Sequence, residues 1–194
     1  GDPTEAGSLA GCLHYLESAF FGRCGAVALR AIRERSVQGA GAHELSDSLR
    51  TSLQWLLAYL PTAKPRVVSL IRESRPVIVF TDGACEEVTV DGVRKVEVTV
   101  GAVMIDGDKP AQFFGMKVPD SVADSWRSGD SWQVIGQAEL FPVLLARLTW
   151  RRALAGRDVL YFVDNDAARQ GLVKGYSPVL SSCRILGEAA LADA

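Results

Sequence analysis

Three acidic residues occupy positions from which carboxylates of different elements can meet. Asp82 follows the largely apolar run 77–81, and Asp164 follows the apolar run 159–163 in the same way. Glu139 stands early in a long apolar-periodic stretch. Three carboxylates around one point repel each other unless a divalent cation binds among them, and two such ions about 3.5–4 Å apart support in-line phosphoryl displacement. The pattern predicts Mg²⁺-dependent phosphodiester chemistry.

The elements around these residues must bring them together. The continuous apolar character of 77–80 is typical of a buried strand, and 158–163, which contains the apolar run 159–163, is expected to be a second buried strand. If these strands are adjacent and parallel, the Asp at each tip lies at one edge of the sheet, where α/β folds place ligands. Residues 135–154 read as one long helix, and Glu139, about one turn in, would lean toward that edge. Pro142 requires an irregular first turn or a late helix start.

The remaining elements after residue 76 complete a mixed sheet. Residues 87–105 alternate between apolar and polar, which indicates a hairpin turning near Asp91-Gly92 or a single long strand after that turn. A further strand is expected at 112–118, and helices at 166–173 and from 177 to about 192. The order β-β-β-α-β-α-α predicts an α/β fold, with a mixed sheet flanked by helices.

Residues 1–65 predict a separate, all-helical subdomain. Apolar spacing indicates helices at 8–21, 26–37 and 45–60, and Pro61 ends the third. The segment 61–65 reads as a linker.

Each acidic residue also has an ordinary structural explanation. An Asp after a strand is often a turn residue or a helix N-cap; Asp82 precedes a glycine, and Asp166 could cap the helix that follows it. A single Glu on a helix is usually solvated. The joint pattern is rarer than its parts and favours a cluster, with Asp166 as a helix cap beside it.

Composition excludes other classes of function. The 194 residues are 48% hydrophobic, enough for a core, and the net charge of -2 gives no overall basic signature for nucleic acid. No apolar run reaches membrane-spanning length and no signal peptide is visible, so we expect no membrane partner. The four cysteines form no CxxC, which favours reduced thiols in an intracellular protein, nuclear or cytoplasmic. Because the chain begins at Gly1, we interpret it as a piece of a longer protein.

Three segments resemble the first three acidic motifs of the ribonuclease H family. They are Val79-Phe-Thr-Asp82-Gly-Ala, Gln137-Ala-Glu139-Leu and Val163-Asp164-Asn-Asp-Ala-Ala-Arg-Gln-Gly-Leu. The resemblance covers residues 76–194. It implies a ribonuclease H-like fold, Mg²⁺ or Mn²⁺ with two ions in a complete site, and hydrolysis of RNA in RNA–DNA hybrids.

By motif match, the resemblance makes Asp82, Glu139 and Asp164 the metal ligands and catalytic residues. Gln137 and Asn165, from the second and third motifs, are candidates for contacting the nucleic acid. The family also has a last strand and a fourth acidic residue near its C-terminus. This chain ends at Ala194, inside or just after the last predicted helix, so we expect the domain to lack that strand and motif.

Residues 9–23 and 49–61 resemble the thumb or connection segment of retroelement reverse transcriptases, of the tyrosine-recombinase retrotransposon type. The resemblance implies that Arg23, Arg30 and Arg33 follow the backbone of the hybrid, and that the polymerase portion of the same polyprotein is a partner. The alternative for these arginines is a solvated helix face, and the alternative for Trp55 is a core residue.

The leading hypothesis is divalent-metal-dependent, endonucleolytic hydrolysis of RNA in hybrids by the C-terminal part of a reverse transcriptase. One alternative is a catalytically incomplete, ribonuclease H-like structural or binding module of a retroelement polymerase. Another is a different enzyme of the same broad fold, such as a 3′–5′ exonuclease or a transposase-like strand-transfer enzyme.

Overall fold

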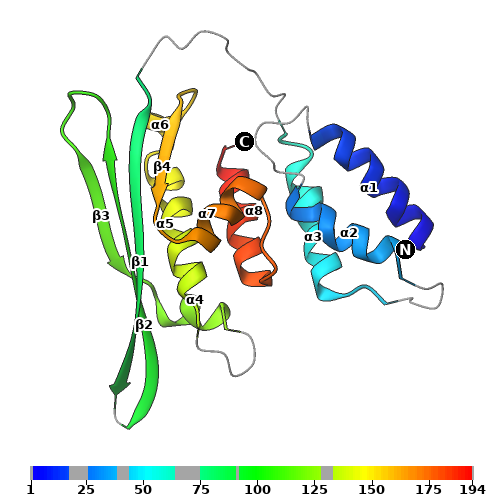
Figure 1. Ribbon diagram of the computed structural model, residues 1–194, viewed down its shortest axis with the longest axis horizontal. Helices are drawn as coiled ribbons and strands as arrows, with labels where there is room; N and C mark the ends of the chain where they lie inside the picture. The colour runs from blue at the N-terminus through cyan, green and yellow to red at the C-terminus, as the bar shows by residue number, and fades with distance from the viewer. Residues whose placement is uncertain are drawn as a thin grey trace.

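A computed structural model describes residues 2–17, 26–38, 44–63, 75–90, 92–127 and 133–193. Eight helices and four strands lie in these ranges (Figure 1). In chain order they are α1 (Pro3–Glu17), α2 (Ala26–Ser36), α3 (Asp47–Tyr59), β1 (Val77–Val90), β2 (Val93–Ile105), β3 (Gln112–Lys117), α4 (Asp120–Ser125), α5 (Ile135–Thr149), α6 (Arg151–Leu154), β4 (Val159–Val163), α7 (Asp166–Lys174) and α8 (Leu180–Asp193). None of the described helices is long and apolar enough to cross a membrane.

The four strands form one mixed sheet with the order β3-β2-β1-β4. β1 pairs antiparallel with β2 and parallel with β4, and β2 pairs antiparallel with β3. Helices α5, α7 and α8 lie on one side of the sheet, and α1, α2 and α3 lie beyond α8 (Figure 1). This arrangement confirms the expected α/β class and is consistent with a ribonuclease H-like sheet preceded by an all-helical subdomain.

Strand β1 is much longer than its apolar run predicts. It extends from Val77 to Val90 and forms a hairpin with β2, so the hairpin alternative is correct and Asp82 lies inside a strand rather than at its tip. The alternating residues of β2 supply a hydrogen-bonding partner along the whole of β1, which lets the polar second half of β1 stay extended.

The two faces of the sheet differ in burial. Val77 and Val79 of β1 are fully buried beneath the helices, together with the neighbouring residues of β2. Phe80 and Phe162, on the opposite face, are 44% and 51% exposed and stack with ring centroids 4.8 Å apart. Both apolar runs do form strands, but they are buried on one face only, because no described helix covers the second face.

Helix α5 is shorter than expected and runs through its proline. It ends at Thr149, and the buried Trp150 separates it from the short α6, so the single helix predicted over 135–154 is wrong. Pro142 lies inside α5, fully buried, so the alternative of a late helix start is wrong. The small helix α4 carries no periodic signal long enough to predict.

The N-terminal helices form a core of their own. α1 begins at Pro3, five residues before the expected start, because proline suits the first helical turn and the Asp2 carboxylate accepts the Thr4 N–H at 2.7 Å. Ser46 caps α3 by accepting the Leu49 N–H at 3.2 Å. Trp55 is buried in this core, as its ordinary explanation expects.

Candidate metal centre

Asp82 and Asp164 are brought together by the parallel pairing of β1 with β4. Thr81 of β1 is paired with Val163 of β4 in the parallel register. The residues that follow them, Asp82 and Asp164, therefore lie at the same edge of the sheet. β4 ends at Val163, which leaves Asp164 at its carboxyl end, while Asp82 stays in β1 opposite Gly101 of β2. Both Asp side chains are exposed at this edge.

Glu139 reaches the same point from α5. It lies just over one turn into the helix and is only 5% exposed. One carboxylate oxygen from each of Asp82, Glu139 and Asp164 lies within 4.8 Å of the other two. The structure thus brings together the three residues that the sequence analysis selected.

The electrostatics of Glu139 show that this cluster is unfavourable on its own. The pKa of Glu139 is raised from 4.5 to about 7, chiefly by burial and then by the charges of Asp164 and Asp82, against a hydrogen bond from the Gly83 N–H that lowers it. Its Oε2 atom is buried and has no hydrogen-bond partner among the described residues. A buried carboxylate oxygen with no donor needs a cation or a proton.

The donor set fits a hard divalent cation. Mg²⁺ and Mn²⁺ prefer carboxylate and water oxygens, and the buried, unpartnered oxygen of Glu139 is the atom that such an ion would satisfy. The exposed carboxylates of Asp82 and Asp164 leave room for water to complete the coordination. The three residues can therefore hold a metal ion.

Two residues of β1 belong to this region and were not selected from the sequence. Gly83 donates its N–H to Glu139, and a glycine inside a strand is the signal that could have identified it. Cys85 lies two residues further along; burial and the charge of Glu139 raise the pKa of its thiol. Cys85 is not among the converging ligands.

The residues after Asp164 have different roles from those expected. Asn165, not Asp166, is the N-cap of α7, and its Oδ1 accepts the Ala168 N–H at 3.0 Å. Asp166 is the first residue of the helix and pairs with Arg169 at 2.6 Å. The interpretation of Asp166 as the cap is wrong, and the candidate nucleic-acid contact Asn165 has a structural role through its side-chain oxygen.

The candidate contact residue Gln137 has a buried side chain. It is 4% exposed, and its Nε2 donates to the Ser181 hydroxyl at 2.8 Å. Ser181 in turn donates to the Trp126 carbonyl at 3.2 Å. The side chain therefore contributes to the contact between α5 and α8, where its amide would otherwise be buried without a partner.

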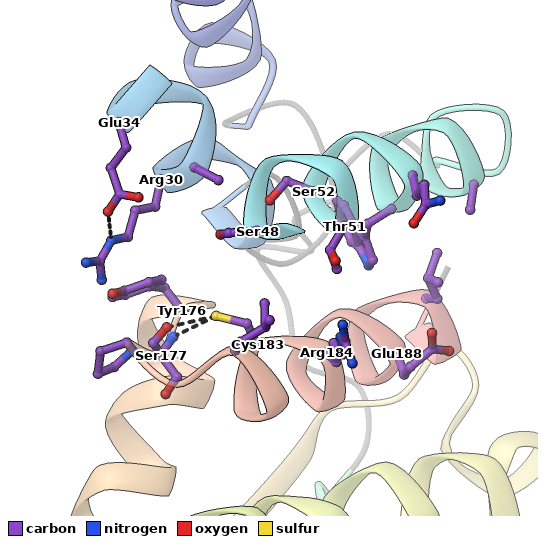
Figure 2. A pocket seen from close by; sticks show the side chains of 17 residues that line it. Arg30, Glu34, Ser48, Thr51, Ser52, Tyr176, Ser177, Cys183, Arg184 and Glu188 are labelled. Carbon is purple, nitrogen blue, oxygen red and sulfur yellow. Dashed lines mark hydrogen bonds and ion pairs between the residues drawn. The ribbon is translucent and has the colours of Figure 1, made fainter. Parts of the chain in front are cut away.

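Two of the three candidate arginines of the helical subdomain, Arg30 and Arg33, lie on α2. Arg23 is outside the described residues. Arg33 is exposed on α2, and Arg30 pairs with Glu34 while its guanidinium lies 4.8 Å from the centre of the Tyr176 ring. Figure 2 shows Arg30 above Tyr176 at one end of a cavity of about 560 Å³ between α2, α3 and α8. None of the three clustered carboxylates lines this cavity.

Comparison of the chain with protein-family models, with curated proteins and with solved structures found no match.

Proposed function

We propose that this chain is a ribonuclease H-type endoribonuclease that hydrolyses the RNA strand of RNA–DNA hybrids with Mg²⁺ or Mn²⁺. The observation that carries the proposal is the convergence of Asp82, Glu139 and Asp164 within 4.8 Å, with a buried and unpartnered oxygen on Glu139. Folding alone does not require three carboxylates to meet, because their repulsion opposes it. A role for the bound cation accounts for the arrangement.

The three carboxylates have distinct positions in such a reaction. Asp82 would be the ligand shared by two ions, with Glu139 and Asp164 each holding one of them, since all three carboxylates converge. Bound ions would supply an activated water and charge stabilisation at the leaving 3′-oxygen. The buried position of Glu139 fixes its carboxylate against β1, and the exposed edge leaves a phosphodiester free to approach Asp82 and Asp164.

The proposed context is the C-terminal part of a retroelement reverse transcriptase, with the polymerase portion as a partner. The motif resemblance over residues 76–194 and the thumb-like or connection-like helices before it support this context. Recognition of RNA would rest on backbone and 2′-hydroxyl contacts, because Gln137 is buried. Arg33 is exposed and remains available for contact with the backbone of a hybrid.

The test is cleavage of labelled RNA–DNA hybrid, duplex DNA, and single-stranded RNA and DNA, each with Mg²⁺, Mn²⁺ or EDTA. We expect metal-dependent internal cleavage of the RNA strand of the hybrid alone. Asp82→Asn, which keeps the size of the side chain, should abolish it with an unchanged circular dichroism spectrum. Equal cleavage by that variant would contradict the site, and stepwise removal of terminal nucleotides would indicate an exonuclease instead.

A catalytically incomplete binding module is the second candidate. Three carboxylates converge among the described residues, and after β4 these residues form only α7 and α8. A titration with Mg²⁺ or Mn²⁺ separates the candidates in part, since ligand binding to the folded state raises the melting temperature by mass action. No shift at tens of millimolar metal would favour the module.

A further inference from the structure

We infer that Gly83 is a positioning residue of the metal centre: its missing side chain lets α5 approach β1 closely enough to place Glu139 beside Asp82. The inference rests on the metal-dependent function proposed above. Its evidence is the contact between the backbones of β1 and α5.

The approach at Gly83 leaves no room for any side chain. A Cβ atom there would lie 2.2 Å from the Ala138 carbonyl oxygen, 2.4 Å from the Ala138 carbonyl carbon and 2.9 Å from the Glu139 nitrogen. All three atoms are helix backbone, so no rotamer change can relieve the overlap. By contrast, a Cβ on Gly136 in the first turn of α5 would meet no atom within 4 Å.

Pro142 explains why this carbonyl can face the strand. In a regular helix, the Ala138 carbonyl accepts the N–H of the residue four positions later, which here is Pro142 and has no N–H. The proline ring also crowds that carbonyl. Gly83 therefore packs against the carbonyl whose usual helical donor is missing. The Gly83 N–H donates to the carboxylate of Glu139, which is the residue after Ala138.

A side chain at position 83 would disturb the position of the metal ligand Glu139 more than the stability of the fold. Relieving an overlap of this size requires α5 to move by about 1 Å, whereas metal–ligand distances tolerate about 0.2 Å. Mg²⁺ demands near-ideal octahedral geometry at 2.0–2.1 Å, whereas Ca²⁺ accepts irregular sites at 2.3–2.6 Å. A widened site should thus lose Mg²⁺ affinity more than Ca²⁺ affinity, which general destabilisation would not do.

The experiment compares Gly83→Ala with Gly136→Ala, which adds the same methyl group to α5 in open space. Isothermal titration with Mg²⁺ and with Ca²⁺ is combined with urea unfolding in EDTA. For Gly83→Ala we expect at least a tenfold loss of Mg²⁺ affinity and a smaller loss for Ca²⁺. Gly136→Ala should bind both ions as the parent does.

The outcomes separate this inference from the proposed function. A folded Gly83→Ala protein with the parent's Mg²⁺ affinity, or with equal losses for both ions, would overturn the role of Gly83 while leaving the metal centre intact. A parent that binds neither ion would overturn the proposed function itself. If Gly83→Ala does not fold, Pro142→Ala restores the helical donor to Ala138; it should lower Mg²⁺ affinity several-fold without loss of stability, and unchanged affinity would refute the inference.

Discussion

The indole of Trp55 on α3 lies directly against the backbone of Gly187 on α8. A Cβ atom on Gly187 would be 2.6 Å from Nε1 and 2.8 Å from Cδ1 of the Trp55 ring. Trp55 also stacks on Tyr59, with ring centroids 4.8 Å apart, and Ala190 and Leu191 of α8 pack on the same helical core. The helical subdomain thus packs on the face of α8 that carries Gly187, Ala190 and Leu191.

Gly187→Ala should weaken this contact. The added methyl group meets a large, buried ring, and overpacking of this kind costs about 1–3 kcal/mol. Gly11→Ala is the matched control, because a Cβ there meets nothing within 4 Å and alanine is the better helix former in the interior of α1. Urea unfolding followed by circular dichroism should show a loss for Gly187→Ala and none for Gly11→Ala. Equal stability of the two variants would show that the Trp55 contact adapts without strain.

Glu139→Gln should stabilise the metal-free protein at alkaline pH. The pKa of Glu139 is raised from 4.5 to about 7, so the folded state binds a proton more tightly than the unfolded state, and the resulting stability is lost as pH rises through 7. At pH 8 the charged carboxylate costs about 3 kcal/mol relative to the neutral amide. In EDTA the variant should be more stable than the parent at pH 8, with the difference vanishing near pH 4.

Metal should reverse that order. Saturating Mg²⁺ should stabilise the parent and leave Glu139→Gln unchanged, because the amide supplies a weaker ligand without charge. Thermal melting of the parent and of Glu139→Gln, each with and without Mg²⁺, measures the stabilisation of the parent and its absence in the variant. A variant less stable than the parent at pH 8 in EDTA would show that the carboxylate is not the unfavourable group that its burial and neighbours indicate.

Mg²⁺ binding should weaken in acid at a pH set by the same residue. A metal ion must displace the proton on Glu139, whose pKa lies at about 7, so affinity should fall about tenfold for each pH unit below 7 and level off above it. Isothermal titration between pH 5.5 and 8.5 gives this profile directly. A Mg²⁺ affinity that stays constant down to pH 5 would mean that the metal displaces no proton from Glu139, and it would contradict this prediction.

The site was predictable where local pattern determines position. Asp164 follows an apolar strand and Glu139 opens an apolar helix, so each was placed by its own segment, and the parallel pairing of β1 with β4 did the rest. The burial of the strands was not predictable, because the run that contains Phe80 is apolar on both faces and only the tertiary structure decides which face is covered. The length of β1 depends on its distant partner β2.

Side chains beside the site could not be assigned from sequence. In the run Asp164-Asn-Asp, asparagine and aspartate are equally good N-caps, and the cap falls on Asn165 because β4 ends at Val163 and α7 begins at Asp166. Gln137 is polar and close to Glu139 in the chain, yet it points toward α8 because two residues apart on a helix face different directions.

Asp164 and Asp166 provide the sharpest test of the cluster, since they are the same residue type two positions apart. Asp164 converges with Asp82 and Glu139, whereas Asp166 is exposed and pairs with Arg169. Asp164→Asn should remove the Mg²⁺-induced rise in melting temperature and reduce hybrid cleavage by at least a hundredfold. Asp166→Asn should keep both and lose at most about 1 kcal/mol from a surface ion pair and the first turn of α7. If Asp166→Asn loses metal binding as severely as Asp164→Asn, the cation lies nearer to the start of α7 than the convergence of the three carboxylates indicates.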